Sequence, residues 1–234
     1  MRLVLVPGFT QTAASWDPVR SHLGPGMDVL AIDVPTGRGF PQTAAAIGEL
    51  GGPAIYAGYS MGGRLCLRLA LDRPDLVRGL VLISGSPGIA DDAERATRRE
   101  ADERLARDIE RDGVDAFLEA WLRQPLFASL PAGAAGLDDR RAGNTVATLT
   151  HALRALGQGA QEPLWDRLGD LEAAFLPVAG TLDQKYVDIA FEMAEAVGSD
   201  VHPVLIGNAG HAVHLEQPEA VASALRRVVH DLTS

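Results

Sequence analysis

The chain has 234 residues, of which 47% are hydrophobic and 22% charged, and its formal net charge is −10 at pH 7. This length suits one sizeable α/β domain with a modest insertion, and the composition excludes a disordered protein. The acidic balance argues against nucleic acid or an anionic membrane surface as the main partner, because both attract a positive field. An anionic ligand would therefore need a local group of arginines.

Short β-branched apolar runs alternate with longer helical patterns, which is typical of a parallel sheet with crossover helices. The expected strands are Leu3–Val6, Val29–Ile32, Ala54–Gly58, Gly79–Ser84, Phe175–Ala179 and Val201–Ile206. The expected helices of the same region are Ser15–Leu23, Thr43–Leu50, Gly62–Leu71, Tyr186–Val197 and Pro218–Leu232. The pattern predicts an α/β fold: a mostly parallel sheet of about six strands, with helices on both faces and one exposed edge.

The alternation breaks once, between residues 87 and 166, where only amphipathic helical pattern occurs. We expect helices at Asp91–Gly113, Val114–Arg123 and Asn144–Gly157, with a loop at residues 130–136. An insertion after one strand of a parallel sheet lies at the carboxyl ends of the strands, where such sheets bind ligands. Residues 87–166 are therefore predicted to form a helical cap, with 1–86 and 167–234 as the core.

The compartment is inferred from the absence of export signals. Cys66 is the one cysteine, so no intramolecular disulfide can form, and its place in an apolar helical stretch predicts a small core residue. The apolar run at residues 3–6 is too short for a signal peptide. No segment approaches the roughly 20 apolar residues that span a bilayer. We expect a cytoplasmic enzyme without a membrane span, and the sequence does not indicate its oligomeric state.

A glycine-flanked serine follows the third expected strand, in the segment Gly58-Tyr59-Ser60-Met61-Gly62. A serine on a tight strand-to-helix turn strains its backbone, and only glycine leaves room at the flanking positions. The helix presents its positive end and free N–H groups to an anion beside Ser60. The pattern G-x-S-x-G is weak evidence in a chain with 25 glycines, but its place between strand and helix predicts a nucleophile elbow.

Ser60 needs a histidine that is itself oriented by a carboxylate. His211 lies in a glycine-bearing loop after the last expected strand, and Asp183 lies in the loop after the preceding strand. This matches the chain order Ser, Asp, His of such sites. His214 stays open as a lesser alternative to His211, and Asp188 is expected on a solvated helix face. The sequence thus predicts a Ser60–His211–Asp183 triad.

The oxyanion hole of such a site takes one N–H from the residue after the nucleophile and one from the loop after the first strand. Met61 is the expected first donor and Phe9 the expected second, with Gly8 allowing close approach. His211 and His214 have no carboxylate or cysteine at metal-ligand spacing. The sequence therefore predicts no metal and no cofactor.

Several segments together resemble one family of the α/β-hydrolase superfamily. They are GYSMGGR at 58–64, ISGSPGI at 83–89, residues 94–102, WLRQPLFAS at 121–129, GTLDQKY at 180–186 and AGHAVHLEQ at 209–217. They look like the 2-succinyl-6-hydroxy-2,4-cyclohexadiene-1-carboxylate synthases of menaquinone biosynthesis, over nearly the whole chain. The elbow and the histidine loop are common to many α/β-hydrolases, whereas ISGSPGI at 83–89 and WLRQPLFAS at 121–129 are more diagnostic of this one family.

The resemblance implies a carbon–oxygen lyase with an α/β-hydrolase fold. Members eliminate pyruvate from 2-succinyl-5-enolpyruvyl-6-hydroxy-3-cyclohexene-1-carboxylate, which would make Ser60, activated by His211 and Asp183, a general base. The implied partner is a small anionic substrate, a polycarboxylate, which arginine forks suit.

The resemblance also implies which residues bind this substrate. Matched by position, the family's carboxylate-binding arginines fall on Arg64, Arg98 and Arg141, and its pocket residues on Tyr59 and Trp121. Arg64 has an independent argument, because it lies one helical turn after the elbow serine and so on the same side of the helix.

Two departures from the family pattern leave other functions open. Pro7 stands where the family usually has histidine, and residues 35–39 read Pro-Thr-Gly-Arg-Gly instead of containing Pro-Gly-His-Gly. Both lie near the expected mouth of the site. A carboxylester or thioester hydrolase with Ser60 as nucleophile is the alternative, because it needs only the triad and the hole. A non-catalytic receptor is disfavoured by the complete triad.

Overall fold

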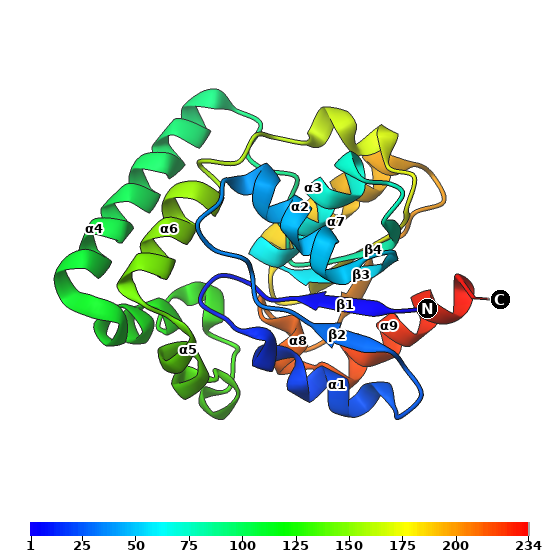
Figure 1. Ribbon diagram of the computed structural model, residues 1–234, viewed down its shortest axis with the longest axis horizontal. Coiled ribbons are helices and arrows are strands. Elements are labelled where there is room, and N and C mark those ends of the chain that lie inside the picture. The colour runs from blue at the N-terminus through cyan, green and yellow to red at the C-terminus, as the bar shows by residue number, and fades with distance from the viewer. Residues whose placement is uncertain (234) are drawn as a thin grey trace.

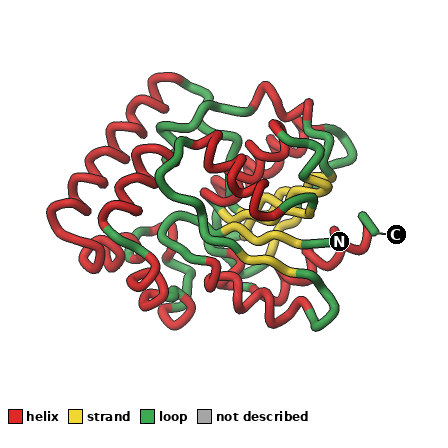
Figure 2. Tube along the Cα trace, in the orientation of Figure 1, coloured by secondary structure: helices red, strands yellow, loops and turns green. Residues whose placement is uncertain are grey.

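A computed structural model describes residues 1–233 of the chain. Within them the centre is a six-stranded parallel sheet with the order β2-β1-β3-β4-β5-β6. The strands are β1 (Leu3–Val6), β2 (Val29–Ala31), β3 (Ala54–Tyr59), β4 (Val77–Ile83), β5 (Ala174–Gly180) and β6 (Val204–Ile206). Figures 1 and 2 show this sheet between helices, which confirms the expected α/β fold.

Each face of the sheet is covered by its own helices (Figure 1). One face carries α2 (Phe40–Gly51), α3 (Met61–Asp72) and α7 (Gln184–Val197). The other carries α1 (Asp17–Leu23), α8 (Val213–Glu216) and α9 (Pro218–Asp231). Because alternate residues of a strand point to opposite faces, each strand contributes to both layers.

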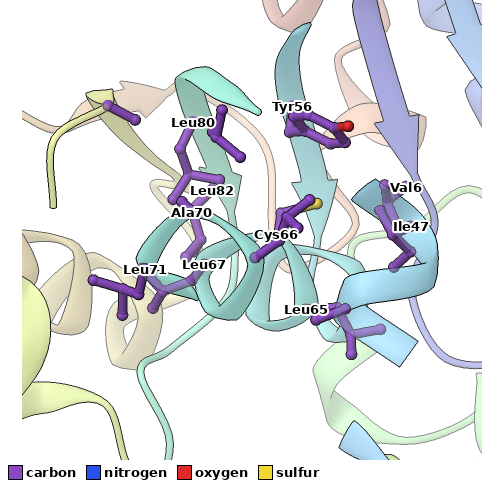
Figure 3. Packing of buried hydrophobic residues seen from close by; sticks show 14 of the residues in the cluster. Val6, Ile47, Tyr56, Leu65, Cys66, Leu67, Ala70, Leu71, Leu80 and Leu82 are labelled. Atoms are coloured by element: carbon purple, nitrogen blue, oxygen red, sulfur yellow. The ribbon is translucent and has the colours of Figure 1, made fainter. Parts of the chain in front are cut away.

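The two sides of β3 and β4 show this alternation. Tyr56 and Leu82 pack toward α3, where Cys66 is fully buried among apolar side chains (Figure 3). Ile55 and Val81 belong to the opposite layer. Cys66 is therefore a core residue, as its apolar surroundings predict.

Prolines account for some of the boundaries at which the structure differs from the sequence prediction. Strand β6 begins at Val204 instead of Val201, because Pro203 has no N–H to donate to the ladder. Helix α2 begins at Phe40 and takes Pro41 into its first turn, where proline is well tolerated. The expected helix Ser15–Leu23 is a 3₁₀ turn, Ala13–Trp16, followed by α1.

Between β4 and β5 the described chain contains helices and no strand. They are α4 (Asp92–Leu122), α5 (Leu137–Gly143) and α6 (Val146–Leu156), and residues 87–166 are referred to below as the cap. The two helices expected within α4 are joined by a kink at Gly113, where φ is 83°. Figure 1 shows α4 beside α6, and buried side chains such as Ile109 and Leu153 form a small core between them.

Candidate active site

Ser60 lies at the junction of β3 and α3 with a strained backbone. Its φ of 50° and ψ of −109° are rare for a residue with a side chain, and its N–H donates to the Ile83 carbonyl at 2.8 Å. A Cβ at Gly58 would lie 2.5 Å from the Gly62 backbone, and one at Gly62 would lie 2.4 Å from the Val6 carbonyl oxygen. Both glycines of the motif are therefore required by close backbone packing.

His211 lies between Ser60 and Asp183. Its Nδ1 is 2.8 Å from Asp183 Oδ2, and its Nε2 is 3.3 Å from Ser60 Oγ. The three residues follow the carboxyl ends of β3, β5 and β6, and the imidazole is 3% exposed. Hydroxyl, imidazole and carboxylate in this order form the arrangement that draws a proton from serine.

The loop that carries His211 is held by Glu216 of α8. The Glu216 carboxylate accepts the N–H of Gly210 at 2.8 Å and that of Ala212 at 3.0 Å, one on each side of the histidine. A Cβ at Gly180 would lie 2.3 Å from the Gly210 carbonyl oxygen, so glycine is needed where β5 meets this loop. The sequence analysis missed Glu216, whose signal was a carboxylate five residues after the histidine.

The two expected oxyanion donors, Phe9 and Met61, line the same pocket as Ser60. Met61 is the first residue of α3, and the first N–H groups of a helix have no intrahelical acceptor. Among residues 1–233 the N–H of Phe9 and that of Met61 have no hydrogen-bond acceptor. A Cβ at Gly8 would lie 2.6 Å from the Tyr59 ring, so glycine lets the loop after β1 approach β3.

The pocket beside Ser60 has a volume of about 100 Å³ and lies between core and cap. Its cap wall includes Arg98, Trp121 and Gln158. A second cavity of about 180 Å³ lies beyond Phe9, which lines both. Residues of 87–166 thus form one wall of the pocket that Ser60 lines.

Arg64 reaches this pocket from the second turn of α3. Its guanidinium donates to Gln161 Oε1 at 2.6 Å and to the Leu156 carbonyl at 2.8 Å, and it lies 5.5 Å from the centre of the Phe40 ring. None of these partners is a carboxylate, and burial lowers the pKa of the guanidinium to about 10. A buried cation bonded only to neutral groups favours an anionic ligand.

Arg98 adds a second guanidinium to the pocket from α4. Its Nε donates to Asp102 Oδ1 at 2.8 Å and its Nη1 to Gln158 Oε1 at 3.2 Å. Gln158 in turn donates to the hydroxyl of Tyr186 at 3.3 Å, and burial raises the pKa of that hydroxyl. This chain of hydrogen bonds holds the Arg98 side chain against the pocket.

The sequence analysis did not single out Asp102, Gln158 or Tyr186. Tyr186 follows Asp183 by three residues, about one helical turn, so its position was a usable signal. Asp102 is only 4% exposed, and its burial arises from contacts between the cap helices, which no local pattern shows.

Arg141, expected from the resemblance to bind substrate, does not line the pocket. It forms ion pairs at the protein surface with Asp115 at 3.1 Å, Glu119 at 3.3 Å and Asp138 at 3.3 Å. The preceding residue, Arg140, turns inward instead and is 3% exposed. Successive helical residues point about 100° apart, so in α5 only one of the two arginines can face the interior.

Trp121 and Tyr59 both line the pocket. The Trp121 ring meets that of Phe9 edge-on at 5.2 Å, and its Nε1 is buried without a hydrogen-bond partner. The Tyr59 ring lies 5.4 Å from that of His211. The pocket therefore has aromatic walls and one unused indole donor.

His214, the lesser alternative for the histidine, lies behind the site in the core. It is fully buried, with its ring 4.8 Å from that of Trp16 and 4.2 Å from that of Tyr59. Neither ring nitrogen has a hydrogen-bond partner, and burial lowers its pKa well below the usual value. The structure therefore brings His211, and not His214, to Ser60.

Residues 1–233 hold neither a metal-binding cluster nor a helix able to span a membrane. They contain no group of three or more histidine, cysteine, aspartate or glutamate residues that could hold a metal ion. None of their helices combines the length and the apolarity needed to cross a membrane.

The model of the α/β hydrolase family matches residues 3–224. A Salmonella heidelberg (strain SL476) protein named 2-succinyl-6-hydroxy-2,4-cyclohexadiene-1-carboxylate synthase is 31% identical over 243 residues, which cover 97% of this chain and 93% of the relative. The chain belongs to this synthase family.

Two other relatives agree with this family. A Bacillus subtilis (strain 168) protein, named provisionally as the same synthase, is 37% identical over 165 residues. That match covers 69% of this chain but only 60% of the relative, less than two thirds of its length. The solved structure of MenH from S. aureus superposes with a TM-score of 0.92 at 26% identity, covering 100% of this chain and 95% of the other.

Replacing Glu216 should weaken the activation of Ser60. Glu216→Gln removes one of the two acceptors beside His211, and a small displacement of a reacting group can lower a rate by as much as about a hundredfold. We expect fluorophosphonate to label Ser60 about tenfold more slowly or worse, as followed by mass spectrometry. Glu219→Gln, the same change at an exposed glutamate of α9, is the matched control, and equal rates for the two variants would contradict the role of Glu216.

Replacing His214 should remove one source of acid sensitivity. The folded pKa lies below the unfolded value near 6.5, so below pH 6.5 the unfolded chain binds more protons and stability falls as pH falls. His214→Phe should therefore lose less stability than wild type between pH 7.5 and pH 5, by as much as about 2 kcal/mol. Urea unfolding at both pH values measures this. His202→Phe, at an exposed histidine, should lose as much stability between the two pH values as wild type does. If His214→Phe also loses as much as wild type, His214 is not the source of this acid sensitivity.

Proposed function

We propose that this protein eliminates pyruvate from 2-succinyl-5-enolpyruvyl-6-hydroxy-3-cyclohexene-1-carboxylate. The product is the compound after which its relatives are named, 2-succinyl-6-hydroxy-2,4-cyclohexadiene-1-carboxylate. The observation that carries the proposal is the buried guanidinium of Arg64, which shares a pocket with Ser60 and has only neutral hydrogen-bond partners. A polycarboxylate supplies the missing negative charge, whereas a neutral ester leaves it uncompensated.

In the proposed reaction the triad acts as a base. His211 Nε2 takes the proton of the Ser60 hydroxyl, and the serine oxygen takes a proton from a ring carbon. The electron pair of the C2–H bond forms a double bond between C2 and C3, the double bond between C3 and C4 moves to C4 and C5, and the C5–O bond to the enolpyruvyl group breaks with its own pair. The enolpyruvate that leaves takes the proton held by His211 at its methylene carbon and becomes pyruvate. Asp183 keeps the imidazole in the required tautomer.

The remaining pocket residues have distinct proposed roles. The N–H groups of Phe9 and Met61 stabilise the oxyanion that develops on a carbonyl or carboxyl group next to the ring carbon. Arg64 and Arg98 bind substrate carboxylates as charge-assisted donors. Trp121 supplies an aromatic wall and a free indole N–H.

The cap has to move when such a substrate binds. The pocket measures about 100 Å³ and the adjoining cavity about 180 Å³, whereas sites for molecules of this size span about 300 Å³ or more. Outward movement of the cap admits the substrate, and its return excludes water from the reaction.

A pyruvate assay with freshly made substrate tests the proposal. Wild type should release one pyruvate per product, and Ser60→Ala should lose nearly all of this activity, because the proton acceptor is gone. Circular dichroism checks that the variant is folded. An active Ser60→Ala would refute the role of Ser60 as the base. No pyruvate from wild type, together with an acyl group trapped on Ser60 by p-nitrophenyl esters, would favour the hydrolase alternative.

A pair of arginine variants tests how carboxylates are bound. Arg98→Ala should raise KM about tenfold to a hundredfold, since a hydrogen bond to a charged group contributes about 1.5–3 kcal/mol. Arg141→Ala should leave KM within about twofold of wild type, because Arg141 lies outside the pocket lining. Steady-state kinetics of pyruvate release measures both. Equal effects of the two substitutions would show that Arg141 reaches the substrate after all.

A further inference from the structure

The loop that carries Phe9 contains a threonine in an unfavourable conformation. Residues 8–11 form a turn closed by the Gln11 N–H to the Gly8 carbonyl at 3.2 Å, and Thr10 is its third residue with φ of 69°. A positive φ at this turn position usually selects glycine. For a β-branched residue this conformation is an outlier, so contacts outside the turn must hold Thr10.

Those contacts come from the cap. Arg140 Nη1 donates to Thr10 Oγ1, and Asn144 Nδ2 donates to the Thr10 carbonyl oxygen at 2.8 Å. The threonine and the arginine are each 3% exposed. One residue is thus held at both its side chain and its backbone by groups about 130 positions away in the chain.

The two cap residues are themselves fixed. Arg140 Nε donates to the Ala135 carbonyl at 2.7 Å, and Asn144 Nδ2 also donates to the Arg140 carbonyl at 2.8 Å. A Cβ at Gly143 would lie 2.2 Å from the Thr12 methyl group, so α5 lies directly against the loop. Figure 1 shows α5 beside the chain that leaves β1.

Arg140 is not placed to bind the substrate. It does not line the pocket of Ser60, and the acceptors of its hydrogen bonds are Ala135 and Thr10. Its contact with Thr10 therefore reaches the pocket through the loop.

We propose that Arg140 and Asn144 are positioning residues that hold Thr10 in its left-handed conformation and so keep the Phe9 N–H directed at the reacting oxyanion. The oxyanion hole is then complete only while α5 of the cap is in place. The inference rests on the proposed function in one respect, the use of this hole in pyruvate elimination. Fluorophosphonate labelling of Ser60 needs the same hole for its phosphoryl oxygen, so it reports on the hole whatever the natural substrate is.

A double-mutant cycle tests the proposal. Asn144→Ala and Arg140→Met are each made in wild type and in Thr10→Gly, because glycine adopts a positive φ without outside support. We expect each substitution to lower kcat and the labelling rate about tenfold in wild type, with KM within about twofold. In the Thr10→Gly background the same substitutions should each lower them less than about threefold. Asp139→Asn, at an exposed residue of α5, is the matched control.

The outcomes separate this proposal from the preceding one. Equal losses in the two backgrounds, or no loss in wild type, would overturn the positioning role. Thermal unfolding identifies a variant that fails to fold. If either Asn144→Ala or Arg140→Met fails to fold, the result of the double-mutant cycle is taken from the other substitution. Labelling without pyruvate release from wild type refutes the proposed function but leaves this test intact. A wild-type protein that shows neither labelling of Ser60 nor release of pyruvate refutes both the positioning role and the proposed function.

Discussion

The close approach of α3 to β1 and β3 is the constraint on which the site depends. It is possible only because positions 58 and 62 carry no side chain, and it forces Ser60 into a strained conformation at the start of a helix. The same helix start brings the free N–H of Met61 beside the serine and places Arg64 one turn further on. Ser60, the free N–H of Met61 and the Arg64 guanidinium thus derive from one strand-to-helix junction, and a side chain at either glycine disturbs all three.

The electrostatics of the pocket oppose those of the chain as a whole. The protein carries a formal net charge of −10, yet two guanidinium groups line the pocket beside Ser60. Asp102 bonds to one of them from a buried position, and no carboxylate bonds to the other. Long-range attraction therefore contributes little to the capture of an anion. The proposed binding of an anion therefore depends on hydrogen bonds formed within the pocket between core and cap.

The sheet and the Ser60–His211–Asp183 arrangement could be predicted because their signals are local: an apolar run, then a polar residue in the following loop. The contacts of Glu216, Gln158 and Tyr186 could not, because they depend on how separate helices pack. The position of Arg141 at the surface, outside the pocket, has a similar cause. Helix α5 has seven residues between Gly136 and Asn144, too few to show an apolar periodicity, so its orientation depends on packing against its neighbours and cannot be derived from its own sequence.

The kink at Gly113 divides α4, the longest helix of the cap, into two helical segments. The first segment carries Arg98 and the second carries Trp121. These two residues of the pocket lining therefore belong to helical segments that are separated by the kink. A positive φ at the break suits glycine and interrupts the regular hydrogen bonding of the helix. A change in the angle at Gly113 therefore shifts the wall that contains Arg98 relative to the wall that contains Trp121, and so alters the width of the pocket between them.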